Sequence, residues 1–355
     1  MKHKVKKLLA KRPFRRRKSE ESLQEAIHNI PRITNETVAE HREEVLGSAR
    51  KYIYPLQHSA HRIVIISTII FGLLTIAFFV YCVLALYRFN STSTFIYRVT
   101  QVIPFPVAKA GPDFVAYENY LFELRHYMHY YQTQQQVDFN SDSGRQQLAA
   151  FRKVALESVI NDAYTKQLAA KHKVHVADQE LNDQVALLRN QNRLGSSDAV
   201  FEDVLKEFWN WSIADFKREL KMQMLSQKVV STLDDSTHAR ARNVFAQLSN
   251  GGDFAALAKQ YSDEAGAKES GGDYGFAISK TNRVLPPQVI DMLFKLKPSE
   301  TSAIVETPLG LEILRLREAD GSTVRASHIF FAFKKPSTYI DPLKKEKKPR
   351  HFIGL

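Results

Sequence analysis

Residues 239–280 read ARARNVFAQLSNGGDFAALAKQYSDEAGAKESGGDYGFAISK, and residues 285–318 read LPPQVIDMLFKLKPSETSAIVETPLGLEILRLRE. These two stretches decide the fold of the C-terminal half. Their start has helical spacing, and Gly271-Gly272 permits a backbone turn into a short strand. The end alternates apolar and polar residues on either side of a tight Pro308-Leu309-Gly310 turn, which predicts a β-hairpin. Helices packed on one side of such a sheet predict an α+β domain.

The same residues resemble the parvulin-type (PpiC-like) peptidyl-prolyl isomerase domain. Five pieces carry the resemblance in the family's order across about 80 residues: Gly252-Asp253-Phe254, Tyr261-Ser262-Asp263, Gly271-Gly272-Asp273-Tyr274-Gly275, the helix from Pro287 to Leu296, and the closing hairpin. The resemblance implies an antiparallel sheet with helices over residues 237–333, and prolyl isomerase activity.

The resemblance also implies a polar centre of two histidines near a Cys, Asp or Glu. Glu264 falls on the acidic position, whereas Glu312 stands where the family's last strand has a histidine. A second carboxylate near Glu264 would raise one of the two pKa values. The departure at Glu312 puts turnover in question, although it leaves the fold prediction unchanged.

The strand that carries the family's other histidine is missing from its usual place before the first helix. His238 lies there in a charged helical stretch and is discounted, but residues 324–331 (VRASHIFF) resemble the missing strand and contain His328. One explanation is a circular permutation, in which this strand follows the hairpin after a short Asp-Gly connection. The other is a truncated second domain. We favour the permutation, because residues 334–355 are too few for another core.

Prolyl isomerisation breaks no bond and only lowers the barrier of ~18–20 kcal/mol for rotation about the amide. An apolar groove that binds the twisted amide best would do this. The positions that match the family's groove give five candidate wall residues: Tyr274, Phe276, Leu285, Val289 and Phe294. For Phe294, a place in the hydrophobic core is an equal alternative.

Residues 88–236 precede this domain and are mostly helical in pattern. Residues 95–115 are β-prone and predict a short strand or hairpin, and four helical runs follow: 117–136, 145–173, 178–193 and 212–232. Ser212 and Asp215 have capping-box spacing. The order of VINDAYTKQLAAKHKVHVADQELNDQV (159–185) and FEDVLKEFWNWSIADFKRELKMQMLSQKV (201–229) resembles the N-terminal chaperone region of SurA/PrsA-type foldases. The resemblance implies a domain that binds unfolded clients.

Residues 63–87 contain no charged side chain and are long enough to span a bilayer as a single transmembrane helix. The first 18 residues hold ten Lys and Arg and no acid. By the positive-inside rule, residues 1–62 form a basic cytoplasmic arm and residues 88–355 lie outside the cytoplasm. No small-x-small cleavage site follows the apolar run, so we interpret it as a signal anchor of a single-pass cell-membrane protein.

The formal charge of +12 is concentrated at the two ends. Residues 1–62 hold a surplus of eight positive charges and the predicted basic tail, 334–355, a surplus of five, whereas residues 88–333 are nearly neutral. Attached to a membrane helix, the basic arm is better explained by anionic lipid than by nucleic acid, so no nucleic-acid partner is expected.

No metal and no cofactor are expected either. The pairs His126/His129 and His172/His175 lack a carboxylate at metal-binding spacing, and the phosphate-loop, nucleophile-elbow and zinc-helix motifs are absent from the sequence. The single cysteine, Cys82, excludes an intramolecular disulfide.

Taken together, the sequence predicts an extracytoplasmic foldase that isomerises X-Pro bonds in secreted or envelope proteins and binds unfolded clients. Glu264, His328 and Glu312 are the predicted polar centre. The alternative is a catalytically inactive holdase or scaffold that keeps the parvulin shape to grip proline-containing peptides.

Overall fold

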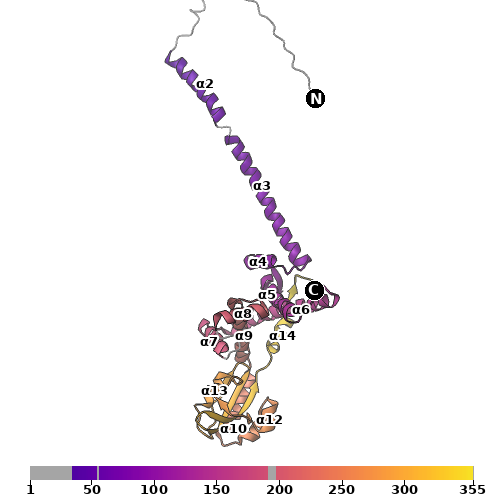
Figure 1. The fold of residues 1–355 in the computed structure, drawn as a ribbon, viewed down its shortest axis with the longest axis vertical. Helices are drawn as coiled ribbons and strands as arrows, with labels where there is room; N and C mark the ends of the chain where they lie inside the picture. The colour runs from indigo at the N-terminus through magenta and orange to yellow at the C-terminus, as the bar shows by residue number, and fades with distance from the viewer. Residues whose placement is uncertain (1–33, 54–55, 191–196, 355) are drawn as a thin grey trace, which may run out of the picture. The chain divides into compact units, whose positions relative to one another are not determined.

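The computed structural model describes residues 34–53, 56–190 and 197–354 (Figure 1). The chain divides into two compact units, residues 1–80 and 81–355. In the first unit, helix α2 covers Asn35–Ile53 and most of α3 (Leu56–Val83) follows. The most basic segment, residues 1–18, lies outside the described residues.

The apolar helix continues from α3 into a π-helical turn, η1 (Leu84–Arg88). Residues 61–88 have a mean hydropathy of 2.8, and among the described residues this is the one helix whose length and composition would allow it to cross a membrane.

The last turns of this helix are packed into the second unit. Leu86 is fully buried, and the Tyr117 hydroxyl donates a hydrogen bond to its carbonyl oxygen at 2.7 Å. The Tyr87 hydroxyl donates to the carbonyl of Pro106, also at 2.7 Å. Leu86 and Tyr87, at the end of the helix, therefore belong to the folded core of the second unit.

The prediction of a strand from residue 95 is wrong for its first half. Residues Thr94–Val102 form helix α4, whose N-cap Ser93 accepts a hydrogen bond from the amide of Ile96. The hairpin follows as β1 (Pro106–Ala110) and β2 (Asp113–Ala116).

Five helices then complete the helical part: α5 (Tyr117–Gln134), α6 (Asp142–His172), α7 (Asp178–Asn190), α8 (Asp198–Trp209) and α9 (Ile213–Leu233). The four predicted runs correspond to α5, α6, α7 and α9, and the predicted capping box of Ser212 and Asp215 is present. Helix α8 was missing from the predicted runs.

The sheet part begins with α10 (Asp235–Ser249), α11 (Phe254–Tyr261) and α12 (Ala265–Ser270), and α13 (Pro287–Leu293) follows later. Its four antiparallel strands are ordered β3-β6-β5-β4. Their bounds are Ile278–Ser279 (β3), Val305–Thr307 (β4), Gly310–Ala319 (β5) and Thr323–Ala332 (β6).

Helices cover both faces of this sheet, so the prediction of helices on one side is wrong. Leu311 and Ile313 of β5 pack with α10 and α11, while Leu314 and Leu316 pack with α13. Because successive residues of a strand point to opposite faces, these two sets belong to two separate cores.

Strand β6 lies in the interior of the sheet, between β3 and β5. Its pairing with β5 runs from Ala332 opposite Gly310 to Val324 opposite Ala319. This is the position that the permutation hypothesis requires, since the residues after the hairpin complete the same sheet. The evolutionary permutation itself stays a prediction.

Residues 334–355 are predicted to be a basic tail, but residues 334–354 fold back on the helical part. Helix α14 covers Ser337–Glu346, and β7 (Arg350–His351) pairs with β1 to complete a sheet of order β2-β1-β7. Ile340 and Ile353 are buried in the core formed with α5 and α6. Figure 1 shows the chain returning as a yellow segment from the sheet part to the helical part. The spacing of apolar residues was too sparse to predict this.

Candidate functional site

The alternation of β6 decides which side chains reach the candidate site. Ile329 and Phe331 point into the core with α10 and α11, so His328 and Phe330 point to the opposite face. Across the ladder Phe330 lies opposite Glu312, which puts these two residues and His328 on one face. The strand pairing therefore brings together two of the three residues predicted for the polar centre.

The Gly-Gly motif holds the backbone beneath the histidine. Gly272 has φ +91°, and its carbonyl accepts a hydrogen bond from the His328 amide at 2.8 Å. A Cβ atom at Gly272 would lie 2.6 Å from the His328 carbonyl oxygen. Only glycine fits this approach, which explains the motif in physical terms.

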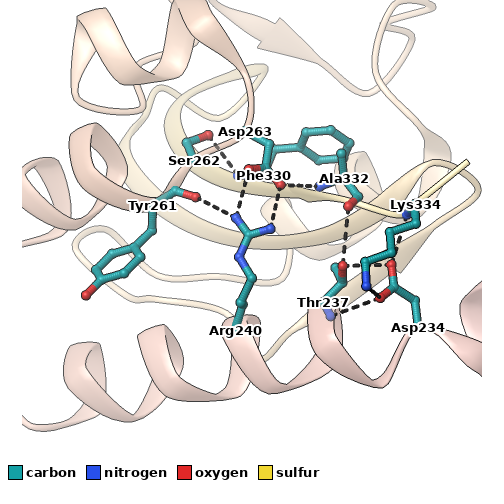
Figure 2. Close-up of polar contacts among 9 residues, drawn as sticks. All are labelled: Asp234, Thr237, Arg240, Tyr261, Ser262, Asp263, Phe330, Ala332 and Lys334. Atoms are coloured by element: carbon teal, nitrogen blue, oxygen red, sulfur yellow. Dashed lines mark hydrogen bonds and ion pairs between the residues drawn. The ribbon is translucent and has the colours of Figure 1, made fainter.

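The Ser262-Asp263 pair attaches the neighbouring loop to the edge of β6 (Figure 2). The Ser262 hydroxyl accepts from the Phe330 amide at 3.2 Å, and the Asp263 carboxylate accepts from the Ala332 amide at 2.9 Å. Arg240 fixes the same carboxylate with two hydrogen bonds of 2.7 and 3.1 Å. These contacts satisfy the backbone amides of Phe330 and Ala332, which lie beyond the short pairing of β6 with β3, and they position the next residue, Glu264.

Glu264 and His328 are in direct contact. The His328 Nε2 atom lies 2.7 Å from Glu264 Oε2, so Nε2–H donates to the carboxylate. The His328 side chain is 5% exposed and its Nδ1 is buried without a hydrogen-bond partner, while the Glu264 side chain is 55% exposed. The pair joins a buried ring to a carboxylate at the rim of the site.

Tyr274 connects the histidine to the second carboxylate. Its ring stacks on His328, with centroids 4.0 Å apart and planes 16° apart, and its hydroxyl donates to Glu312 Oε2 at 2.9 Å. Burial, together with the charge of Glu312, raises the pKa of Tyr274 well above its ordinary value. Burial also raises the pKa of Glu312, against the opposing effects of His328 and the Tyr274 hydroxyl.

A cavity of about 640 Å³ opens over these four side chains. Phe276 and Leu285, both predicted as wall residues, line it. The structure adds wall residues that the sequence analysis did not single out, among them Pro286, Leu309 and Phe330. Alternation with His328 along β6 was the signal for Phe330, whereas Leu309 comes from the exposed tip of the hairpin.

The other two predicted wall residues lie elsewhere. Val289 is fully buried in the core between α13 and the sheet, and Phe294 packs against the same core. Neither side chain lines the cavity described above. Pro287 begins α13, and the helical spacing of Val289 and Leu293 turns both residues toward the sheet.

Asp234 ties together the two places where the chain passes between the helical part and the sheet part (Figure 2). It caps α10 through Thr237, and its carboxylate also accepts from the Lys334 amide at 2.9 Å. Burial alone would raise the pKa of Asp234, but the hydrogen bonds from Lys334, Ser236 and Thr237 lower it to about 2. This carboxylate thus stays charged and holds the exit of β6 to the start of α10.

A second cavity, of about 380 Å³, lies within the helical part and is lined by charged residues of both signs. Glu123 of α5, Asp162 of α6 and Glu219 of α9 line it together with three cations, Lys166, Arg218 and Lys221. Burial and the neighbouring carboxylates raise the pKa of Glu123, and burial with Glu219 raises that of Asp162 to about 6. Within the described ranges, no His, Cys, Asp or Glu cluster of three or more is placed to hold a metal ion.

The raised pKa of Glu123 in this cavity predicts a loss of stability with rising pH. The folded state keeps protons on Glu123 that the unfolded state releases above about pH 4.5, so the free energy of unfolding falls as pH rises above that value. Glu123→Gln removes the titrating group and should raise the melting temperature at pH 8 more than at pH 5. Thermal melts followed by the fluorescence of Trp209 and Trp211 measure this, with the exposed Glu202→Gln as control. Equal shifts at both pH values would contradict the prediction.

Two family models match the chain, one mainly over the helical part and one mainly over the sheet part. Residues 223–318 match the PPIC-type PPIASE domain, and residues 57–230 match the SurA-like N-terminal domain. The first match ends before β6, the strand that carries His328.

Three curated relatives are similar to part of this chain. Foldase protein PrsA of Caldanaerobacter subterraneus is 24% identical over 53% of this chain and 63% of its own length. Foldase protein PrsA 3 of Bacillus anthracis is 31% identical over 43% of this chain and 58% of its own length. Chaperone SurA of Burkholderia orbicola is 29% identical over 48% of this chain and 35% of its own length. The chain thus spans less than two thirds of the length of each of these relatives.

Among solved structures, PrsA from Bacillus subtilis matches 58% of this chain and 82% of its own, with 20% identity and a TM-score of 0.21. Foldase protein PrsA from Streptococcus pneumoniae matches 58% and 79%, with 17% identity and a TM-score of 0.23.

Proposed function

Because the chain joins a SurA-like N-terminal domain to a PPIC-type PPIase domain, we propose that it is an extracytoplasmic foldase anchored in the cell membrane. In this proposal it isomerises X-Pro bonds in secreted or envelope proteins and binds their unfolded chains. The observation that carries the proposal is the cavity over Glu264, His328, Tyr274 and Glu312.

The cavity has the properties that amide rotation needs. A planar amide is stabilised by a charge-separated resonance form, and the twisted transition state loses this polarity. Apolar walls such as Phe276, Leu285 and Leu309 favour the less polar, twisted form. The polar side chains of the centre are held in fixed orientations by their mutual contacts. In this proposal they form hydrogen bonds to the twisted amide that are stronger than those to the planar amide, so the site binds the transition state better than the ground state.

A larger groove continues from this cavity and supports client binding. It has a volume of about 1060 Å³ and shares Leu187, Leu188 and Leu309 with the first cavity. The α9 side of its lining mixes apolar and uncharged polar residues, including Leu220, Gln223, Met224 and Gln227. Four charged residues also line the groove: Glu180, Asp183, Lys228 and Glu306. A surface of this kind can contact unfolded segments of many sequences, since flexible Met-containing surfaces adapt to different partners.

The proposed location follows from residues 61–88. With a basic arm before it and the two domains after it, this helix would place the N-terminus in the cytoplasm and residues 88–355 outside, with no cleavage of the anchor.

A non-catalytic holdase is the second candidate, and Glu312 is the observation that favours it. A buried carboxylate in place of the family's histidine changes the polarity of the site. The cavity would then bind proline-containing peptides without accelerating their rotation.

An isomerisation assay separates the two candidates. The full chain should be used in detergent, because Leu86 at the end of the apolar helix belongs to the core. A chain that starts at residue 88 would lack Leu86, and the core residues around it would be exposed. The proposal expects cis-to-trans conversion of a proline peptide faster than the uncatalysed ~10–100 s. Background activity with retained suppression of client aggregation would overturn the enzyme and leave the holdase.

A further inference from the structure

We propose that the surface around the end of the apolar helix docks on the headgroup region of an anionic phospholipid bilayer. This juxtamembrane face consists of Phe95, Arg98, Val102, Lys109, Phe114 and Phe352. The inference rests on the proposed membrane anchoring and adds to it a second, peripheral contact that fixes the domains against the bilayer.

Helix α4 supplies the first half of the face. Its inner side buries Ile96 and Thr100, while Phe95 and Val102 are 56% and 82% exposed. Phe95, Arg98 and Val102 recur at helical spacing and share the outer side. An exposed stripe of large apolar residues with a cation between them is typical of helices that lie in a membrane interface.

The small sheet supplies the second half. Lys109 of β1 lies directly opposite Phe114 of β2, with its Nζ 5.2 Å from the centre of the Phe114 ring. Phe114 and Phe352 are 65% and 37% exposed, and their ring centroids are 6.3 Å apart. Two exposed aromatic rings beside a lysine match the aromatic and basic composition of membrane-interface anchors.

Both halves lie beside the end of the apolar helix. The Phe95 ring is 6.4 Å from the ring of Tyr81, and α4 begins six residues after Arg88. On the other side, the Tyr87 hydroxyl bonds Pro106, and the Phe352 amide donates to the carbonyl of the adjacent Val107.

Because the face adjoins the end of the proposed membrane helix, we expect the bilayer to be what covers it. Leu86, at the end of the helix, is buried in the same unit as this face, so the face lies next to the point where the chain would leave a bilayer. Arg98 and Lys109 add positive charge to that face, which favours anionic lipid.

The test places an environment-sensitive fluorophore on the face of the full chain. Val102→Cys and, as the matched control, the exposed Ser249→Cys in α10 are each labelled in a Cys82→Ala background and reconstituted in vesicles. The vesicles contain phosphatidylcholine alone or with phosphatidylglycerol, with or without a nitroxide-labelled headgroup lipid. We expect a blue-shifted, nitroxide-quenched emission at position 102, stronger with phosphatidylglycerol, and an aqueous, unquenched emission at position 249.

Vesicle flotation in the same samples distinguishes failure of the anchor from failure of the docking face. Chains that do not float with vesicles would overturn the anchoring and the docking with it. Chains that float with an aqueous spectrum at position 102 would overturn the docking alone. A blue shift without nitroxide quenching would also overturn the docking, because the fluorophore would then be shielded by protein and not by lipid. Equal quenching in neutral vesicles would overturn the preference for anionic lipid.

Discussion

Deletion of residues 323–355 is expected to abolish the cooperative unfolding of the sheet part. The deletion removes β6, which pairs with both β3 and β5 and contributes Val324 and Ile329 to the two cores. Phe331 is lost as well. Burial of three such side chains contributes roughly 1.5–3 kcal/mol each, which together approaches the whole stability of ~5–15 kcal/mol of a typical domain.

Hydrogen exchange at the amides of β5 measures the effect, because these amides lose their pairing with β6. The matched control deletes residues 336–355 and keeps β6 and Lys334, the partner of Asp234. This shorter deletion removes Ile340 and Ile353, so it should lower the stability of the helical part, which contains both tryptophans, and leave β5 protected. Protected β5 amides after the longer deletion would favour the truncated-repeat explanation.

The sequence was sufficient for features whose determinants are local. The hairpin of β4 and β5 follows from alternation around a tight turn, and the start of α11 follows from Asp253, whose side chain accepts from the Ala256 amide. The contact of Glu264 with His328 could be predicted from the sequence, because each residue lies in a recognisable motif. The pairing of β6 with β5 then brought the two motifs together.

Features that depend on distant partners were missed. Residues 94–102 contain Phe, Ile, Tyr and Val and read as a strand, but a Ser93 cap and burial of Ile96 stabilise a helix there. The C-terminal segment has few apolar residues and was therefore predicted to be a tail. Its apolar residues pack against a core whose other residues lie about 200 positions earlier in the chain, and this pairing is not visible in the local sequence. Val289 resembled a groove residue because spacing along a helix does not tell whether one side faces a cavity or a sheet.

His328→Ala is expected to cause the largest loss of isomerase activity among single substitutions at the site. The change removes the hydrogen bond to Glu264 and the ring on which Tyr274 stacks. A hydrogen bond to a charged group contributes about 1.5–3 kcal/mol, and a loss of this size in the transition state lowers kcat/KM about 10- to 150-fold. Glu264→Gln keeps an acceptor and loses the charge, so a smaller decrease is expected.

Glu269→Ala is the matched control, because it removes an exposed carboxylate from α12 while leaving the cavity lining intact. Suppression of client aggregation should persist in all three variants, since the groove beside α7 and α9 is unchanged. A role in orienting the twisted amide predicts that kcat falls more than KM rises. Unchanged kcat/KM in both His328→Ala and Glu264→Gln would refute this polar centre, even if the wild-type chain is an active isomerase, because the apolar walls alone would then account for catalysis.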